Sequence, residues 1–419
     1  MKILIISHGF TPHINPRSFR WTALAEHWAH NCGMEVDVLT SPAPGAAEFE
    51  QRDLLSIYRS GVQITPMLST EGGNTGQRRP GFILRSLRWI YRQTWRRLMW
   101  PDYVCLWYFP ARKKARELVG KKKYDWLISV SHPFTGHLVG LSIKRNSPQL
   151  NWMLDIGDPF AFLTEPAPNN LYLYKCLNFA VERNILSLAQ KISVTTIGTQ
   201  ELYEKVFGSA VQGKIKTIPP LLRQSATTDQ AHPVATKAKR LTYLGTLYKN
   251  LRSPTPLLQI FAELLKQSPD KEYELHFYGA INDCEELFAP FQHLLGKNIF
   301  LNGLVPSDQA RAAIARSDVL VNLGNESRFQ LPSKTVECVA SGKPIFNIVS
   351  TSEDSSLKFF SGYPALLTVV GDFSIQKTAD ELKRFIETVQ PVDPNWIKSR
   401  MKAFSMTAIS DSYIDLMKR

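Results

Sequence analysis

The sequence predicts an α/β protein with two doubly wound parallel-sheet domains, and three observations support this. Short apolar segments typical of buried strands alternate with segments of helical periodicity through most of the chain. The 419 residues are too many for one typical core. Two such series each open with an apolar strand that runs into a glycine, Gly9 and Gly245. Ligands of these folds bind beyond the carboxyl ends of the strands, so we expect functional residues there.

The first series predicts an N-terminal domain over residues 1–222. Its expected strands are 2–7, 35–40, 125–130, 151–155, 191–196 and 214–220, and its expected helices lie near 17–31, 134–145 and 170–189. Residues 223–239 are polar and lack aromatic side chains, which is typical of a linker.

The second series predicts a C-terminal domain over residues 240–394. Its expected strands are 241–245, 273–279, 298–303, 318–324 and 344–349, with helices near 254–267, 306–316, 332–341 and 374–388. Strands separated by helices indicate right-handed crossovers and parallel sheets. The amphipathic terminal segment, about 395–419, is expected to be helical and to pack back on the first domain.

The composition is that of a soluble globular protein, with 44% hydrophobic and 21% charged residues. The apolar run in MKILIISHGF is too short for a signal peptide, and no window reaches eighteen uninterrupted apolar residues. The five cysteines are scattered without zinc or disulfide spacing, so we expect reduced thiols and a cytoplasmic protein.

The net charge of +13 is concentrated in part in residues 72–101, which hold seven arginines and no acid. Helical periodicity places Arg85, Arg88, Arg92 and Arg96 in one stripe. Tryptophans accompany that stripe, among them Trp89 and Trp95. A basic helix rich in tryptophan suits the headgroup region of an anionic membrane. The alternatives are a solvated helix face and, less favoured because no nucleic-acid motif is present, a nucleic-acid surface.

The segment LPSKTVECVASGKPI, residues 331–345, has the pattern of a helix with an anion site at its start. Its first proline suits the first turn, and Gly342 suits the left-handed position just past the end. Free N–H groups and the positive end of the helix dipole therefore meet at Ser333 and Lys334. Glu337 projects from the same face and can accept two hydrogen bonds from a ribose diol. The pattern suits a nucleotide diphosphate; the alternative is a capped helix with solvated side chains.

Taken with the order of the elements, these segments resemble the GT-B fold glycosyltransferases, specifically the retaining family-four enzymes. The resemblance covers nearly the whole chain and is strongest at LPSKTVECVASGKPI. It extends to YLGTLYKNLRSPTPLL (243–258), FLNGLVPSDQARAAIARSDVLVNL (300–323) and the first loop, SHGFTPHINPRSFRWTALAEHWA. The bacterial subgroup that builds surface polysaccharides and lipid-linked glycans is the most similar. The implied fold is two Rossmann-like domains facing across a cleft.

The resemblance implies donor-binding roles in the second domain. Glu337 corresponds to the carboxylate that holds the donor ribose, and Ser333 and Lys334 correspond to the signature beside the phosphates. Arg252 corresponds to the basic residue that clamps the diphosphate and stabilises the leaving group, with Lys249 as a possible substitute. Backbone near the base and phosphates is expected at Gly245 and Gly303.

The resemblance also implies roles in the first domain. Gly9 corresponds to a first-loop glycine that lets the backbone approach a substrate. His132, after an expected strand, corresponds to a histidine near the reacting sugar, although a structural histidine is an open alternative. Acceptor contacts are expected at Arg17, Arg20, Asp155 and Asp158, for which solvated or turn-forming roles are the alternatives.

Two positions depart from the family pattern. Phe329 occupies the place of a second glutamate that contacts the transferred sugar, and Thr246 follows Gly245 where an arginine is usual. No Asp-x-Asp motif lies in a suitable loop, so basic residues and the helix dipole are expected to replace a divalent metal, and no cofactor is expected.

The expected function is transfer of a sugar from a nucleotide-diphosphate sugar to a glycan or lipid-linked acceptor, with retention, at the inner face of the cell membrane. Two alternatives share the fold. A sugar-nucleotide epimerase would not need the basic aromatic helix, and a non-catalytic nucleotide-sugar-binding subunit would bind without turnover.

Overall fold

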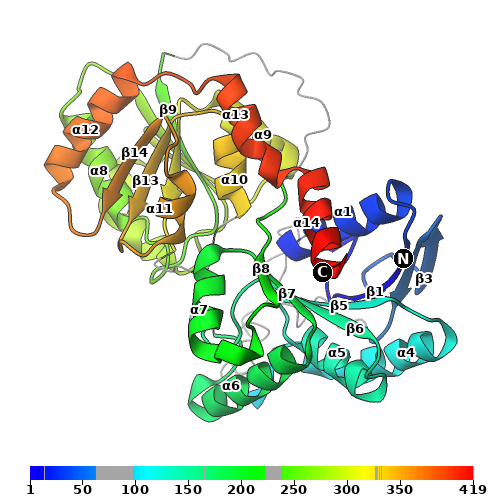
Figure 1. The fold of residues 1–419 in the computed structure, drawn as a ribbon. Coiled ribbons are helices and arrows are strands. Elements are labelled where there is room, and N and C mark those ends of the chain that lie inside the picture. Colours follow the sequence, from blue (N-terminus) through cyan, green and yellow to red (C-terminus); the bar gives the residue numbers. More distant parts are fainter. Residues whose placement is uncertain are drawn as a thin grey trace. The chain divides into compact units, whose positions relative to one another are not determined.

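The computed structural model describes residues 1–13, 15–62, 98–164, 167–222, 237–325, 329, 331 and 333–418. These residues form two compact units (Figure 1). The first unit contains Met1–Leu221 and Met406–Arg419, and the second contains Leu222–Ser405. The expected membrane-contacting helix, with Arg85, Arg88, Trp89, Arg92, Trp95 and Arg96, lies outside the described residues.

The first unit is built on an eight-stranded sheet of order β3-β4-β2-β1-β5-β6-β7-β8. All neighbouring strands are parallel except β3 and β4. The strands are β1 (Lys2–Ile6), β2 (Glu35–Thr40), β3 (Phe49–Arg52), β4 (Leu55–Arg59), β5 (Trp126–Ser131), β6 (Asn151–Ile156), β7 (Lys191–Val194) and β8 (Ile215–Thr217). The six strands expected here are all present, and β3 and β4 were not anticipated.

Helices cover both faces of this sheet because β1 is apolar on both sides. Leu4 and Ile6 belong to a core with the helices α4, α5, α6 and α7, whereas Ile3 and Ile5 belong to a core with α1 and α14. Figure 1 shows α4, α5 and α6 along one face and α1 and α14 along the other. The helices are α1 (Pro16–His30), α4 (Tyr108–Lys121), α5 (Thr135–Asn146), α6 (Leu171–Leu188), α7 (Ile197–Phe207) and α14 (Met406–Lys418), with short 3-10 helices η1 (Cys105–Trp107) and η2 (Gly208–Ala210).

The second unit contains a six-stranded, all-parallel sheet of order β11-β10-β9-β12-β13-β14. Its strands are β9 (Lys239–Leu244), β10 (Tyr273–Tyr278), β11 (Ile299–Gly303), β12 (Val319–Leu323), β13 (Ile345–Val349) and β14 (Leu366–Val370). The order reverses between β9 and β12, and in doubly wound sheets ligands bind at such a reversal.

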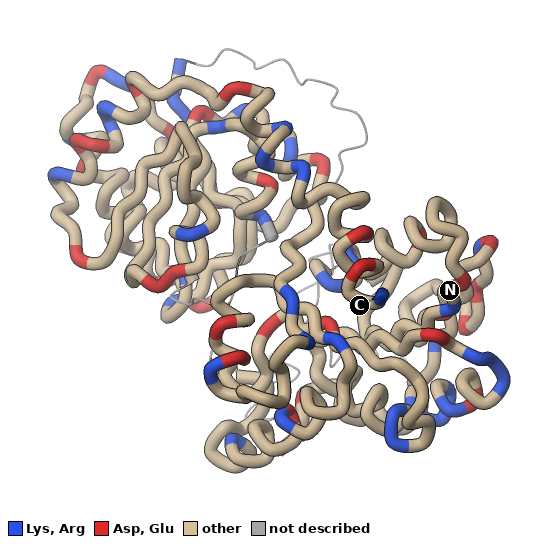
Figure 2. Tube along the Cα trace, in the orientation of Figure 1, with Lys and Arg blue, Asp and Glu red and all other residues tan. Residues whose placement is uncertain are grey.

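Two helix layers enclose this sheet as well. α8 and α12 pack on one face, and α10 and α13 pack on the other. Figure 2 shows the charged residues mainly on the outer helices and loops, as expected for strands that are buried on both faces. The helices are α8 (Thr255–Lys266), η3 (Asn282–Leu294), α9 (Ser307–Arg316), α10 (Ser333–Ala340), α11 (Ser355–Phe360), α12 (Ile375–Thr388), α13 (Pro394–Met401) and η4 (Lys402–Phe404).

The C-terminal segment divides between the two units, whereas the sequence suggested one helix on the first domain. Met401 and Phe404 are buried in the core of the second unit, so α13 and η4 remain with it. Only α14 belongs to the first unit, where the Tyr413 ring lies 5.3 Å from Trp21 and 6.1 Å from Trp28 between ring centroids. The apolar face of the terminal segment is therefore shared by two cores.

Among the residues that the structure describes, no helix has the length and apolar character needed to cross a membrane.

Candidate functional site

Three glycines end three neighbouring strands of the second unit. Gly245 follows β9, Gly279 follows β10 and Gly303 ends β11. The Gly245 N–H donates to the Tyr278 carbonyl at 2.8 Å, and the Gly279 N–H donates to the Gly303 carbonyl at 2.8 Å. A Cβ at Gly279 would lie 1.9 Å from the Gly245 carbonyl oxygen, and its φ is +138°. Only glycine fits there, so bare backbone is presented at this edge of the sheet.

Two of these glycines were expected site residues, and Gly279 was missed. The signal was present in the sequence, because the segment 273–279 also runs from an apolar strand into glycine. The backbone of Gly303 adopts a left-handed φ of +68°. Gly303 is also exposed, which suits close approach of a ligand.

Arg252 lies in the loop after β9, held at the same edge of the sheet. Its Nε donates to the Oδ1 of Asn325, and its Nη1 lies 3.5 Å from the Thr246 carbonyl oxygen. Burial raises the pKa of Tyr243 to about 12, although the neighbouring Arg252 opposes that rise. Arg252 is only partly buried, so its anchored side chain keeps some exposed surface.

Lys249 is exposed in the loop that leads to Arg252. Its backbone N–H donates to the Asp283 Oδ1 at 3.1 Å, which ties the loop to the start of η3. Its ammonium therefore stands on an anchored loop of the same unit.

The helix α10 begins at Ser333, one residue after the expected start, and ends at Ala340. Because α10 connects two parallel strands, β12 and β13, its N-terminus lies at the carboxyl edge of the sheet. Gly342 follows with a φ of +69°, which confirms the expected left-handed position past the helix end.

Lys334 and Glu337 are both partly exposed on α10. Burial raises the pKa of the Cys338 thiol to about 12, with Glu337 adding to the rise and Lys334 opposing it. Both charges are therefore close enough to act on the same buried thiol. The chain thus carries a cation and a carboxylate at the first turns of this helix.

In the first unit, three histidines gather at the carboxyl ends of β1 and β5. The His8 and His13 ring centroids are 6.5 Å apart, and the His13 Nε2 lies 3.3 Å from the Ser41 Oγ. Burial, together with the neighbouring His13 and His132, lowers the pKa of His8 to about 3. His132, the expected site residue, is partly exposed and lies 6.3 Å from the Tyr103 ring between centroids. The other two histidines were missed, although both lie in the first loop.

Gly9 follows β1, where the loop packs tightly against the start of α1. A Cβ at Gly9 would lie 2.6 Å from the Ser18 Oγ and 2.9 Å from the Asn15 Nδ2. Asn15 caps α1 by accepting from the Ser18 N–H at 2.8 Å. The glycine thus brings the loop backbone against the capped N-terminus of α1.

Arg17, in the first turn of α1, is held over the loop after β6. Its Nη1 lies 3.1 Å from the Asp155 Oδ2, and its Nη2 lies 3.4 Å from the Thr195 Oγ1. A Cβ at Gly157 would lie 1.9 Å from Arg17 Nη2, so a side chain at this position would displace the guanidinium. Asp158, one residue later, is partly exposed at the same strand end.

Two expected acceptor residues, Arg20 and Asp155, are buried and hydrogen-bonded within the protein. Arg20 donates to the carbonyls of Ile218 and Pro219 and to the Tyr413 hydroxyl. Asp155 accepts from the Trp21 indole at 2.7 Å, and also from Ser193, Tyr413 and Arg17. Burial alone would raise the pKa of the Asp155 carboxyl, yet Arg17 and Arg20 hold it below its ordinary value. Both residues therefore hold α1, β6 and α14 together.

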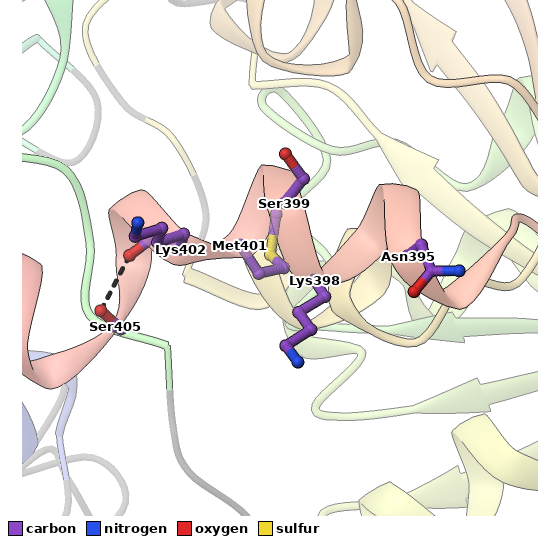
Figure 3. Close-up of a pocket in the computed structure, with 6 residues that line it drawn as sticks. All are labelled: Asn395, Lys398, Ser399, Met401, Lys402 and Ser405. Atoms are coloured by element: carbon purple, nitrogen blue, oxygen red, sulfur yellow. Dashed lines mark hydrogen bonds between the residues drawn. The ribbon is translucent and has the colours of Figure 1, made fainter.

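A surface hollow of about 650 Å³ lies on α13 and η4 of the second unit (Figure 3). In Figure 3 its labelled side chains point in different directions and do not converge on one point. The only hydrogen bond drawn among them joins the Ser405 Oγ to the Lys402 carbonyl at 2.8 Å. Such an arrangement lacks the convergent polar groups of a ligand site. Its lining residues are Asn395, Lys398, Ser399, Met401, Lys402 and Ser405.

Within the described parts of the chain, no cluster of three or more His, Cys, Asp or Glu side chains is arranged to hold a metal ion.

No protein-family model matches the chain, and no curated protein matches it. Solved structures do. Sucrose-phosphate synthase from Thermosynechococcus elongatus is similar over 100% of this chain and 98% of its own, with 15% identity and a TM-score of 0.65. The lipopolysaccharide outer core galactosyltransferase WaaB is similar over 100% and 99%, with 12% identity and a TM-score of 0.58. A putative UDP-N-acetylglucosamine 2-epimerase from Listeria monocytogenes is similar over 100% and 95%, with 12% identity and a TM-score of 0.56. The whole chain therefore has the GT-B fold of glycosyltransferases, with its two parallel-sheet domains.

Proposed function

We propose that the chain transfers a sugar from a nucleotide-diphosphate sugar to a hydroxyl of a glycan or lipid-linked acceptor. The observation that carries this proposal is the anchored Arg252 beside the row of glycines in the second unit. A cation held by protein groups at the carboxyl edge of a parallel sheet suits the diphosphate of a donor. The GT-B fold adds support, because a sucrose-phosphate synthase, a galactosyltransferase and a putative UDP-N-acetylglucosamine 2-epimerase have similar structures.

Each donor-binding residue has a distinct part in this proposal. The N-terminus of α10, with Ser333 and Lys334, attracts the phosphates, and Glu337 accepts hydrogen bonds from the ribose diol. Arg252 stabilises the negative charge that builds on the leaving diphosphate, with Lys249 nearby on the same loop. The exposed backbone at Gly303 suits the base.

The proposed reaction is attack of an acceptor hydroxyl on the anomeric carbon of the donor sugar. A carbon–oxygen bond to the acceptor forms while the bond to the diphosphate breaks, and its electron pair passes to the leaving phosphate oxygen. We propose retention, with the acceptor and the leaving group on the same face of the sugar and the acceptor proton passing to the leaving group. The basic side chains and the helix dipole would do the work of a metal here.

Within the first unit, the proposed substrate contacts are His132, Asp158, Arg17 and the loop at Gly9. His132, Asp158 and the loop at Gly9 are partly exposed after strands, and Arg17 is partly exposed in the first turn of α1, unlike the buried Arg20 and Asp155. His132 lies beside other imidazoles and Tyr103, a surface that can donate hydrogen bonds to sugar hydroxyls and stack on a sugar ring.

The reaction is tested by incubating the protein with UDP-, GDP-, ADP- and TDP-sugars and a bacterial lipid extract. The proposal expects release of one nucleoside diphosphate, appearance of the sugar in the lipid or glycan fraction, and no effect of EDTA. Conversion of the sugar to its epimer without transfer would instead support the epimerase alternative. Nucleotide affinity without any turnover would support the non-catalytic subunit.

We further propose that the protein works in the cytoplasm at the inner face of the cell membrane, in the synthesis of cell-surface polysaccharide or glycolipid. The basic, tryptophan-rich segment 72–101 supports this, and so do exposed side chains at its described end and on α6. Leu98 is exposed, and its carbonyl accepts from the Tyr174 hydroxyl on α6 at 2.9 Å. On α6, Tyr172 is 97% exposed, and Leu173 and Leu177 are also exposed.

A vesicle assay tests the membrane proposal. Replacing Arg85, Arg88, Arg92 and Arg96 with glutamine should release the protein from anionic vesicles and leave its nucleotide affinity unchanged. A variant that remains bound would show that this stripe is only a solvated face.

A further inference from the structure

A chain of hydrogen bonds connects the loops after three neighbouring strands of the second unit. Asp354, after β13, is buried, and its Oδ1 accepts from the Ser356 N–H at 2.8 Å, which caps α11. Its Oδ2 accepts from the Asn325 N–H at 2.7 Å, after β12. The Asn325 side chain then accepts from Arg252, after β9. The buried Asp354 carboxylate thus fixes the backbone of Asn325. The Asn325 side chain in turn holds Arg252, the residue proposed to clamp the diphosphate.

Gly324 allows this arrangement. A Cβ at that position would lie 2.6 Å from the Asp354 Oδ2 and 2.7 Å from the Val349 Cγ1. The Gly324 N–H also donates to the Ile348 carbonyl at 2.9 Å, so the loop is held on both sides. A shift of either Gly324 or Asp354 would therefore break one of these hydrogen bonds.

The contact between Asn325 and Arg252 fixes the plane of the guanidinium. Asn325 is only 2% exposed, and its Oδ1 meets Arg252 at Nε, the nitrogen nearest the chain. A guanidinium is planar, so an acceptor at Nε sets the directions of the remaining N–H donors. An amide oxygen does this without a charge of its own, which leaves the positive charge available for an anion.

We propose that Asn325 is a positioning residue that, with Asp354 behind it, orients the Arg252 guanidinium toward the diphosphate of the donor. This inference rests on the proposed function, in which Arg252 holds that diphosphate. It assigns to two buried residues a specific effect on diphosphate binding, separate from the contacts made by α10. Loss of the Asn325 acceptor should therefore weaken binding of diphosphates far more than binding of monophosphates.

The test is a set of binding titrations with nucleoside diphosphates, the matching monophosphates and inorganic pyrophosphate. Asn325→Leu should lower diphosphate affinity by about tenfold, equivalent to 1.4 kcal/mol, and change monophosphate affinity by less than about twofold. In an Arg252→Ala background the same change should have no further effect on diphosphate affinity, because the guanidinium it orients is absent.

Asn322→Leu provides a matched control. Asn322 lies on β12, three residues earlier, and donates to the Asn347 Oδ1 at 2.7 Å, a contact that does not involve Arg252. This variant should keep the wild-type ratio of diphosphate to monophosphate affinity, whatever its stability. Thermal unfolding without ligand checks folding of each variant, and Asn325→Ser replaces Asn325→Leu if the latter does not fold.

Equal losses of diphosphate and monophosphate affinity in Asn325→Leu would overturn the positioning role, because a general structural defect has that result. Additive losses in the double variant would overturn it too. If neither nucleotides nor pyrophosphate bind the wild-type protein, the proposed function fails, and this inference fails with it.

Discussion

At the scale of single residues, the first unit contains a buried carboxyl group whose pKa is raised. Glu182, on α6, accepts from the Ala161 N–H at 2.8 Å and from the Tyr203 hydroxyl. Burial raises its pKa to about 7, although these hydrogen bonds oppose the rise. In the folded protein the carboxyl therefore keeps its proton to a higher pH than in the unfolded chain.

Glu182→Gln should change the pH dependence of stability. The wild-type folded state binds more protons than the unfolded state between about pH 4.5 and 7, so stability from this group is complete below 4.5 and is lost as the pH rises through 7. The interval corresponds to about 3 kcal/mol. Denaturant unfolding should show that, from pH 4.5 to pH 8, the unfolding free energy of the wild type falls by about 3 kcal/mol more than that of the variant. Parallel stability curves for the two proteins would contradict the assignment.

Gly279→Ala should destabilise the second unit. The new Cβ would overlap the Gly245 carbonyl, and the positive φ disfavours alanine, so we expect a loss of about 1–3 kcal/mol from overpacking alone. Gly120→Ala is the control, because Gly120 lies in α4 with no atom within 4 Å of a new Cβ, and helix propensity predicts a gain of about 0.5–1 kcal/mol. Unfolding free energies compare the two variants, and an unchanged Gly279→Ala protein would disprove the close approach.

Glu337→Ala should weaken donor binding by about 1.5–3 kcal/mol, the range for hydrogen bonds to a charged group. Calorimetric titration with the preferred nucleotide measures the change. Glu381→Ala removes an exposed carboxylate from α12 of the same unit and should leave the affinity unaltered. Unaltered affinity in Glu337→Ala would remove the ribose contact from the proposal.

The sequence predicted the helix or strand to which these residues belong better than it predicted which of them are buried. Arg17 and Arg20 are three positions apart on one helix, yet the first is partly exposed and the second is buried against α14. The partner that buries Arg20, Tyr413, lies 393 residues away. No local pattern indicates a contact of that separation, and the same is true of the contact between Arg252 and Asn325.

At the scale of whole elements, α14 packs on the first unit through apolar side chains and through hydrogen bonds buried among them. The Tyr413 hydroxyl donates to Asp155 at 2.7 Å and accepts from Arg20 at 2.8 Å. The Trp28 indole donates to the Ser410 Oγ at 3.0 Å. Burial of both aromatic and charged groups makes this helix part of the core of the unit.

Tyr413→Phe should therefore lower the unfolding free energy of the first unit by about 1.5–3 kcal/mol, because Arg20 and Asp155 lose a buried partner. Chemical denaturation followed by tryptophan fluorescence measures the loss. Tyr172→Phe, at a fully solvated tyrosine of α6, should stay within about 0.5 kcal/mol of wild type. A similarly small effect in Tyr413→Phe would mean that apolar packing alone holds α14.

Most of the strands predicted from sequence are buried on both sides, where continuous apolar runs identify them; β8 and β11 were also predicted, although they are partly or largely exposed. β3 is polar and mostly exposed, and β4 alternates buried and half-buried residues, so neither has such a run. In α4, clustered lysines and arginines and Pro110 conceal the helical period. β3 is the edge strand, β4 is the strand next to it, and α4 lies on the outer surface, where packing demands less of the sequence.

At the scale of the whole molecule, the alternation of strands and helices was sufficient to predict two parallel sheets. It could not predict that the terminal segment divides at Ser405, since both of its helices are amphipathic and each fits a different core. The candidate site likewise has a part that the sequence could predict and a part that it could not. Its strand-end positions were predictable from fold class, whereas the network behind Arg252 depends on loops after three separate strands.

We propose that the second unit has a nucleotide site that needs no metal, and thermal stabilisation by UDP, GDP, ADP and TDP is the first experiment to perform. Each nucleotide is added with and without EDTA, and Arg252→Ala is measured beside the wild type. We expect a clear rise in Tm with one of the four nucleotides, and this rise should be the same with EDTA and much smaller in the variant. No rise with any of them, or a rise that EDTA abolishes, would contradict it.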